Sequence, residues 1–259
     1  YEGTFEHGNE VGTFLSANGF ASLSEVPTDV LSQILLNHVI SADITSTDLT
    51  GLGSGYTTTN ATGAGGNPMS IYFNTSSGVS FNGVSSVSTA DVTATNGTVH
   101  IVDAVIGLPN IVTHAAANPN LSSLVGALTT GGNSTFTDLL SSTTTEFTVF
   151  APNNAAFGAF TNPNVNDLNN ILSNHVIVGA TATSGGLSNS YVSTAAANSD
   201  GDANSLYINT DNGVTLNGTS DVMTVDIIAT NGVIHVVDDV IDLPTVVTFA
   251  LANPALTNL

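Results

Sequence analysis

Histidine is the only side chain of this chain that can carry a positive charge, because the 259 residues include six histidines and no lysine or arginine. Four of the histidines occupy repeated positions. His38 and His175 follow apolar patterns with helical spacing, and His100 and His235 lie in alternating, strand-like patterns. No cysteine is present and no second histidine stands at metal-ligand spacing. We therefore predict structural histidines at the edge of a core, and the alternative is a pH switch in which protonation loosens the packing.

A second candidate for chemistry is an acidic segment with the spacing of a calcium loop. Asp200, Asp202, Asn204 and Asp211 stand at its first, third, fifth and twelfth places. The sixth place holds Ser205 instead of glycine, the twelfth holds aspartate instead of glutamate, and a strand pattern follows instead of a helix. The sequence therefore favours a solvated acidic turn, with loose Ca²⁺ binding as the alternative.

No other pattern predicts catalysis. The chain contains no Gly-x-Ser-x-Gly motif, and the glycine-rich residues 63–66 are not followed by a lysine, as a phosphate loop requires. We therefore expect a protein that is not an enzyme and that needs no cofactor.

The charge of the chain excludes several kinds of partner. Charged residues make up 8% of the sequence, all of them acidic, and the formal net charge is −20. Nucleic acids and anionic membranes would repel such a surface, and we find no apolar run long enough to span a membrane. A salt-adapted surface is one explanation. An exposed extracellular polymer that offers no site to trypsin-like proteases is another.

The chain repeats itself with a period of domain size. Residues 34–40 recur as 171–177, residues 94–103 recur as 229–238, and residues 117–121 recur as 252–256. A period of this length indicates tandem domains rather than a solenoid. We place the boundary after Pro109, which gives one unit over 1–109, a second over 110–244, and a remainder over 245–259.

Each unit begins with helical patterns and ends with strand patterns. Leu168, Ile171, Leu172, His175 and Val176 form one helix face, with Asn166 as the expected N-cap. A further helix is expected to begin at residues 118–119. Alternating apolar residues within 206–237 predict strands, separated by Asn-Gly turns. The order of helices first and strands later indicates an α+β fold.

These segments resemble the fasciclin (FAS1) family. Residues 147–157 resemble its first signature, residues 231–241 its second, and residues 174–177 its central region. In the first unit, residues 96–109 match the second signature well, whereas residues 4–14 match the first only loosely. The resemblance implies tandem domains, each a β-sandwich wedge with flanking helices. It also implies an extracellular or surface-attached protein that works in adhesion and matrix assembly.

The ends of the chain do not coincide with the ends of the repeats. Residues 110–128 supply an opening helix for the second unit, the first unit has no such segment, and residues 245–259 match the opening helix of a further unit. One interpretation is a piece of a longer repeat protein. The other is head-to-tail assembly, in which the terminal segment docks into the first unit of a neighbouring copy. The side chains expected to dock are Val246, Val247, Phe249, Leu251, Leu256 and Leu259.

We therefore expect a secreted adhesion or matrix protein whose partner is a second copy of itself, in a filament. The alternative is a monomeric adhesion module that binds a carbohydrate or another extracellular protein.

Overall fold

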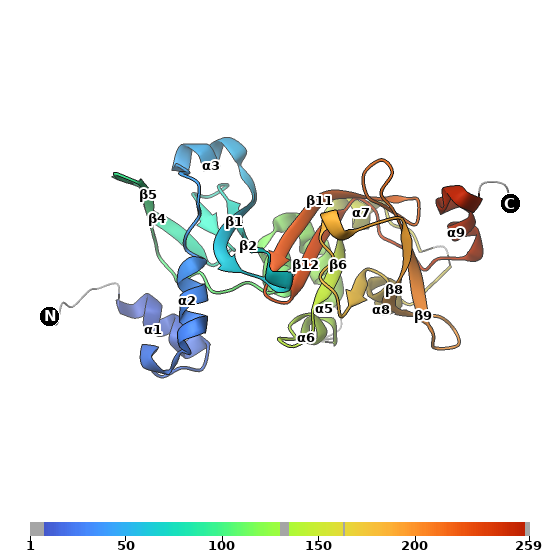
Figure 1. The fold of residues 1–259 in the computed structure, drawn as a ribbon, viewed down its shortest axis with the longest axis horizontal. Coiled ribbons are helices and arrows are strands. Elements are labelled where there is room, and N and C mark those ends of the chain that lie inside the picture. Colours follow the sequence, from blue (N-terminus) through green and yellow to red (C-terminus); the bar gives the residue numbers. More distant parts are fainter. Residues whose placement is uncertain (1–7, 130–134, 163, 257–259) are drawn as a thin grey trace. The chain divides into compact units, whose positions relative to one another are not determined.

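The computed structural model describes residues 8–129, 135–162 and 164–256 (Figure 1). The chain divides into two compact units, Tyr1–Pro109 and Asn110–Leu259. The division falls at the boundary that the repeats predict. Residues 245–256 pack with the second unit.

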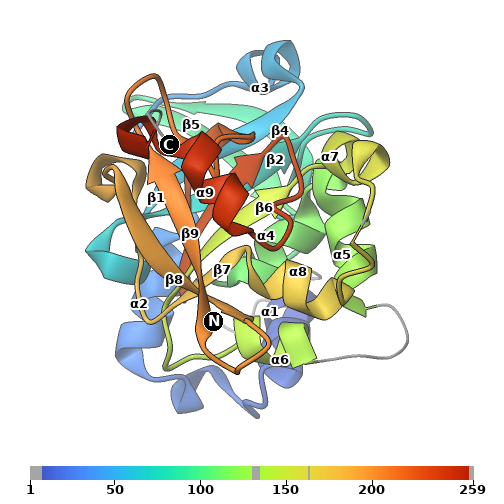
Figure 2. The ribbon, with the colours of Figure 1, turned by 90° about the vertical axis from the view of Figure 1, so that its right-hand side faces the viewer.

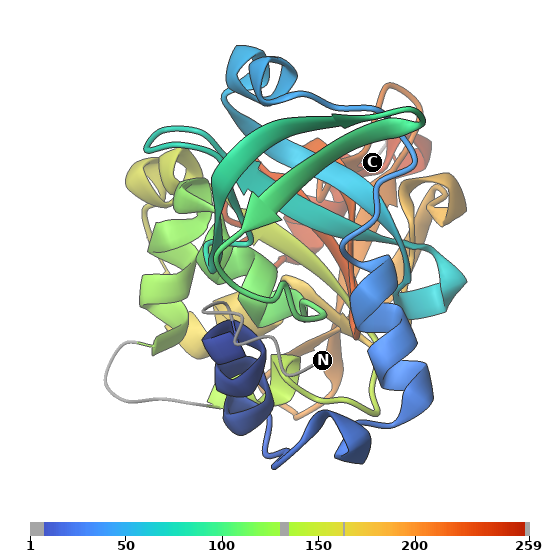
Figure 3. The ribbon, with the colours of Figure 1, turned by 90° about the vertical axis from the view of Figure 1, so that its left-hand side faces the viewer.

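The described residues of unit 1 form a five-stranded antiparallel sheet with three α-helices (Figure 3). The helices are α1 (Gly8–Ala17), α2 (Thr28–Leu36) and α3 (Ser46–Leu52). The strands are β1 (Ser54–Thr62), β2 (Pro68–Asn74), β3 (Ser80–Phe81), β4 (Ser85–Ala94) and β5 (Gly97–Val102), and they follow one another in the sheet in that order. Strand β5 is therefore the last strand of the described sheet.

Unit 2 repeats helix α2 and the five strands of unit 1 and adds further elements. Its helices are α4 (Ile111–Ala117), α5 (Ser122–Thr129), α6 (Thr135–Leu140), α7 (Asn154–Ala159), α8 (Leu168–Ser173) and α9 (Val246–Ala252). Its strands are β6 (Phe147–Pro152), β7 (Val176–Val178), β8 (Ser190–Ala197), β9 (Ala203–Asn209), β10 (Thr215–Leu216), β11 (Ser220–Ala229) and β12 (Gly232–Val237).

The sheet of unit 2 has seven strands in the order β7-β6-β12-β11-β10-β9-β8. Strands β8 to β12 repeat β1 to β5, and β6 and β7 extend the sheet beyond β12. The pair of β6 and β12 is parallel, and the other pairs are antiparallel. Every residue of β6 and β12 is buried, so this pair runs through the centre of the core. The α+β prediction is confirmed.

Asparagine–glycine turns join the strands in both units. Asn82 and Asn217 adopt φ values of 49° and 50°. Their side-chain oxygens accept hydrogen bonds from the backbone N–H groups of Tyr72 (2.8 Å) and Tyr207 (2.9 Å). Asparagine tolerates this left-handed conformation and bonds locally, which explains why it recurs at these positions.

Two helix predictions need correction. The pattern through Val176 predicts one continuous helix, but α8 ends at Ser173 and Val176 begins β7, so the apolar periodicity continues past the end of the helix. Asp167, not Asn166, is its N-cap and accepts a hydrogen bond from the N–H of Asn170. The opening segment forms two α-helices joined by a short 3-10 helix (Pro119–Leu121), which Asn118 caps as expected.

Within the described ranges, no helix combines the length and the apolar character needed to cross a bilayer.

Candidate functional site

The first histidine of each unit joins the end of a helix to a distant loop. The Nδ1 of His175 donates to the carbonyl of Ile171 (2.8 Å), and its Nε2 accepts from the N–H of Ile241 (2.8 Å). In unit 1, His38 makes the same two contacts with Ile34 and Ile106. Both ring nitrogens thus form hydrogen bonds with backbone groups.

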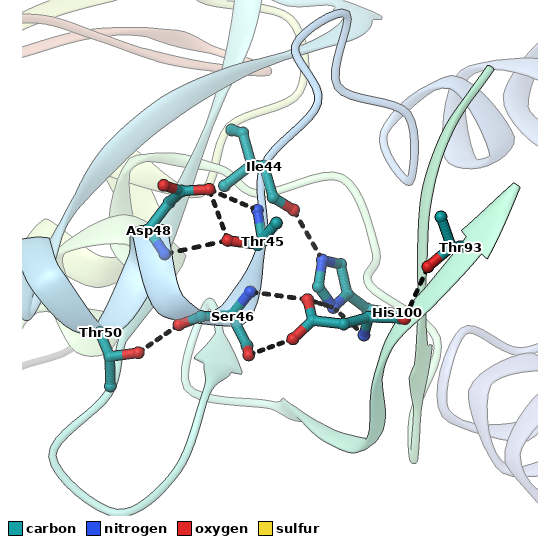
Figure 4. Close-up of polar contacts among 8 residues, drawn as sticks. Ile44, Thr45, Ser46, Asp48, Thr50, Thr93 and His100 are labelled. Atoms are coloured by element: carbon teal, nitrogen blue, oxygen red, sulfur yellow. Dashed lines mark hydrogen bonds and ion pairs between the residues drawn. The ribbon is translucent and has the colours of Figure 1, made fainter. Parts of the chain in front are cut away.

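The second histidine of each unit lies on the closing hairpin. The Nε2 of His235 donates to the carbonyl of Ala182 (2.9 Å), and the Nε2 of His100 donates to the carbonyl of Ile44 (2.9 Å; Figure 4). Thr45 follows Ile44 as the N-cap of α3 and forms a capping box with Asp48. His100 therefore ties β5 to the start of α3.

Burial keeps several histidines of unit 2 neutral. The pKa of His175 and that of His114 are both lowered to about 4, because burial disfavours the charged imidazole. Burial also lowers the pKa of His235. None of the three acts as a free base at the surface, since His175 and His114 are fully buried and His235 bonds to backbone on both sides.

The structure does not bring together the four residues of the alternative calcium loop. Asp200 and Asp202 lie in the turn before β9, and Asp211 lies beyond the other end of that strand, where its carboxylate accepts from the Asn189 amide (2.8 Å). A strand of seven residues separates the two ends by about 20 Å. In the part of the chain that the structure describes, no cluster of three histidine or carboxylate side chains could hold a metal ion.

The described residues of unit 1 do not include the layer that covers the sheet and helix of unit 2. Leu35 is 61% exposed and Val99 is 53% exposed, whereas the equivalent Leu172 and Ile234 are 2% and 1% exposed. Val39, Val92 and Ile101 are exposed as well, and their equivalents Val176, Ile227 and Val236 are buried. We call these five residues of unit 1 the open face: Leu35, Val39, Val92, Val99 and Ile101.

The cover in unit 2 consists of β6 and the opening helices. Strand β6 pairs with β12, and the N–H of Ile111 at the start of α4 donates to the side chain of Asn231 (3.0 Å). Ile111 is 2% exposed and Leu121 is fully buried. In unit 1 the segment that loosely matches β6 is residues 4–9, of which residues 4–7 lie outside the described residues and the last two belong to helix α1.

A cavity of about 340 Å³ lies beside β5 and reaches the open face at Val39 and Val99. His38 and His100 border it, and apolar residues of β2, β3, β5 and the segments around α3 line the rest. Polar groups at the rim and apolar walls below are the usual character of a binding site.

Helix α9 packs on the far end of the unit 2 sheet (Figure 2). Asn253 donates to the hydroxyl of Tyr191 (3.0 Å) and accepts from that of Tyr207 (3.4 Å), and Phe249 meets Tyr191 edge to face at 5.3 Å. A Cβ on Gly218 would lie 2.9 Å from Ala252, so the helix approaches the turn closely.

The predicted docking residues of the C-terminal segment thus separate into two groups. Phe249 packs toward β8, as just described. Val246, Val247 and Leu251 are exposed, and Leu256 is half-buried. Leu259 lies outside the described residues.

Comparison with known proteins identifies the family. A model of the fasciclin domain matches residues 13–109 and 119–244. The chain belongs to the fasciclin family.

Two relatives of this fasciclin chain are informative. A fasciclin-like arabinogalactan protein of Arthroderma benhamiae (strain ATCC MYA-4681 / CBS 112371) is 33% identical over 152 residues, which is 57% of this chain. The chain spans 34% of the length of that relative. A solved FAS1 domain pair from the insect cell adhesion molecule fasciclin I matches 93% of this chain and 88% of its own, with a TM-score of 0.53 and 20% identity. The tandem FAS1 architecture is therefore confirmed.

The open face was not predicted from the sequence. The signal was present, because the aligned repeats show strand β6 in one unit and a poor match in the other. Which residues that difference exposes depends on the pairing of β6 with β12, which residue spacing alone does not specify.

Proposed function

We propose that this fasciclin chain is an extracellular adhesion or matrix structural protein whose copies assemble head to tail. In this assembly, α9 of one copy occupies on unit 1 of the next copy the place that α4 occupies in unit 2. The observation that carries the proposal is a difference in side-chain exposure between two equivalent helix positions. Ile111 of α4 is 2% exposed, whereas Val246 of α9 is 86% exposed.

Helix α9 has one face engaged and another available. Phe249, Ala252 and Asn253 contact unit 2, and Val246 points to none of these partners. In α4 the position of Val246 is buried within the unit. Docking as α4 docks also requires Phe249, the equivalent of the buried His114, to exchange its contact with Tyr191 for one with the neighbouring copy.

Unit 1 offers the complementary surface. Leu35, Val39 and Val99 correspond to residues that, together with Ile111, line one apolar region in unit 2. Burying Val246, Ala250 and Leu256 against them would contribute about 1.5–3 kcal/mol for each large side chain. The contact joins two different surfaces, so it propagates into an open filament if the rotation does not close.

The family assignment and the relatives support an adhesion role outside the cell. The structural neighbour is a cell adhesion molecule, and the curated relative is a fasciclin-like arabinogalactan protein. The net charge of −20 supports a protein partner rather than a nucleic acid.

Sedimentation velocity with negative-stain imaging tests the proposal on the full chain and on its Val246→Asp variant. We expect polymers from the full chain and monomers from the variant, whose folding circular dichroism would verify. Leu251→Asp is the matched control, because Leu251 corresponds to the exposed Ala116 of α4 and should tolerate the charge. A chain that ends at Pro244 should also stay monomeric.

Two results would contradict head-to-tail assembly. A full chain that remains monomeric at all concentrations would favour a monomeric module that binds carbohydrate or a surface protein. Assembly that Leu251→Asp abolishes and Val246→Asp leaves intact would show that α9 does not dock as α4 does.

A further inference from the structure

The position beside the closing strand is occupied in unit 2 and carries no described strand in unit 1. In unit 2, β6 lies parallel to β12, and Phe150 is the directly opposed partner of His235. Phe150 is fully buried, and its ring stacks on the imidazole with centroids 5.5 Å apart. In unit 1, β5 is the equivalent of β12, and no described strand lies on that side of it.

The cavity of unit 1 matches the place of Phe150. Phe150 forms a core cluster with Leu206, Leu216, Val237 and Ile241, among others. The equivalents of these four residues all line the cavity of unit 1, and they are Ile71, Phe81, Val102 and Ile106. His100, the equivalent of the stacked His235, lies at its border. The cavity therefore has the walls of an aromatic pocket.

Two equivalent glycines show where the position of β6 would lie beside β5 in unit 1. A Cβ on Gly232 would come within 2.1 Å of the carbonyl oxygen of Phe147 on β6. Gly97 has nearly the same φ value, 156° against 153°, and a Cβ there would meet nothing within 4 Å. The space beside β5 thus extends from the cavity to the start of the strand.

We propose that unit 1 binds an extended, uncharged segment of a second protein chain as an added strand parallel to β5, with a phenylalanine of that segment in the cavity against His100. Strand addition at a free sheet edge combines backbone hydrogen bonds with side-chain pockets at alternate positions. The phenylalanine supplies the pocket residue, and its neighbours on the segment face the side of Val99 and Ile101.

The charge of the chain indicates that the bound segment is uncharged. The chain has a net charge of −20 and no lysine or arginine, so an acidic segment would be repelled and a basic one would find no partner inside an apolar cavity. Strand β6, which fills this position in unit 2, carries no charge over Phe147–Pro152. The occupant therefore shares the chemistry of β6.

The inference deepens the proposed function without depending on helix α9. The helix would cover Leu35 and Val99, whereas the strand would pair with the free edge of β5 and place its aromatic ring in the cavity, which Val99 also lines. The Val246→Asp chain separates the two contacts in experiment, because it removes a helix contact and leaves β5 unchanged.

The test uses a fluorescent peptide of residues 147–153 and the full chain, at concentrations where sedimentation shows monomers. We expect saturable binding in fluorescence anisotropy, and binding at least about tenfold weaker for a peptide with Phe150→Ala. Hydrogen exchange should slow at the amides of β5 when the peptide binds and remain unchanged at those of β12. Binding should be the same on the Val246→Asp chain, which separates this test from that of the filament.

A cavity-filling variant provides the second test. Val102→Phe places a ring in the cavity and should weaken binding at least about tenfold. Val225→Phe adds the same ring at an exposed position of unit 2 and should leave binding unchanged. The proposal is overturned if the peptide does not bind or if the Phe150→Ala peptide binds equally well. It is also overturned if the amides of β5 that point away from β4 are already protected from exchange in the monomeric chain, or become protected only as copies associate.

Discussion

The ring of Phe150 stacks on the imidazole of His235, with centroids 5.5 Å apart and planes inclined by 27°. One residue comes from β6, near the start of the repeat, and the other from β12, near its end. Their contact lies between two fully buried strands, so it joins the two family signatures within one core. The open face and cavity of unit 1 follow from the lack of this contact.

Removing the ring of Phe150 should destabilise unit 2 strongly. Phe150→Ala leaves a cavity among Leu206, Leu216 and Val237, and the expected loss is about 3–5 kcal/mol in the free energy of unfolding. Urea denaturation measures it. Val225→Ala, at an exposed position of β11, should change the free energy by less than about 1 kcal/mol. A loss of similar size in both variants would show that Phe150 is not a core residue.

Mild acid should destabilise unit 2 before its carboxylates titrate. Burial lowers the pKa of His175 and of His114 to about 4, whereas an unfolded histidine titrates near 6.5. Between these values the unfolded chain binds protons that the folded chain does not, so stability falls as the pH falls. From pH 7.5 to 5.0 the expected loss is on the order of 2 kcal/mol for each histidine, measured by urea unfolding.

The variant His175→Gln separates this effect from general acid sensitivity. It should be less stable than the parent at pH 7.5, because the N–H of Ile241 loses its acceptor. Its further loss between pH 7.5 and 5.0 should nevertheless be smaller than that of the parent. Equal losses in both proteins would mean that His175 does not cause the pH dependence.

Salt should promote self-association of the full chain. A surface with a net charge of −20 and no basic side chain repels its own copies, and their contacts contain no lysine or arginine ion pairs that salt could weaken. Raising the ionic strength from 0.01 to 0.15 M shortens the screening length from about 30 to about 8 Å. Sedimentation should therefore show larger species in the higher salt. Dissociation by salt would point to an interface held by charges.

The internal repeats explain why the fold class could be predicted. Motifs such as residues 229–238 recur almost unchanged, and their Asn-Gly turns mark strand ends directly. The ends of helices were harder to predict, because the apolar periodicity through Val176 continues from α8 into the strand that follows. Side-chain burial extends across both elements, so periodicity alone cannot locate the boundary between them.

The spacing of a calcium loop was misleading for a different reason. Asp200 and Asp211 have the right sequence spacing only if the chain between them curls into a loop. The intervening residues include Leu206, Tyr207 and Ile208, which are buried in β9, and an extended strand separates its two ends. Burial of these apolar residues stabilises the strand, and the strand holds the carboxylates at its two ends apart.

A matched pair of glycine substitutions should report whether a strand covers β5 in solution. Gly232 and Gly97 both lie at the start of a closing strand, with φ values of 153° and 156° that other residues rarely adopt. Alanine therefore imposes a similar backbone strain at each position. In unit 2 the added Cβ also collides with the carbonyl of Phe147, whereas in unit 1 it enters open space.

We expect Gly232→Ala to be the more destabilising of the two by more than about 1 kcal/mol, because β6 must shift to relieve the contact. Thermal or urea unfolding of the two variants beside the parent chain measures the difference. If the peptide of residues 147–153 binds as proposed, Gly97→Ala should weaken that binding while leaving the fold intact, since the Cβ would then meet the added strand. Equal destabilisation by both substitutions would show that the edge of β5 is already covered in the free chain.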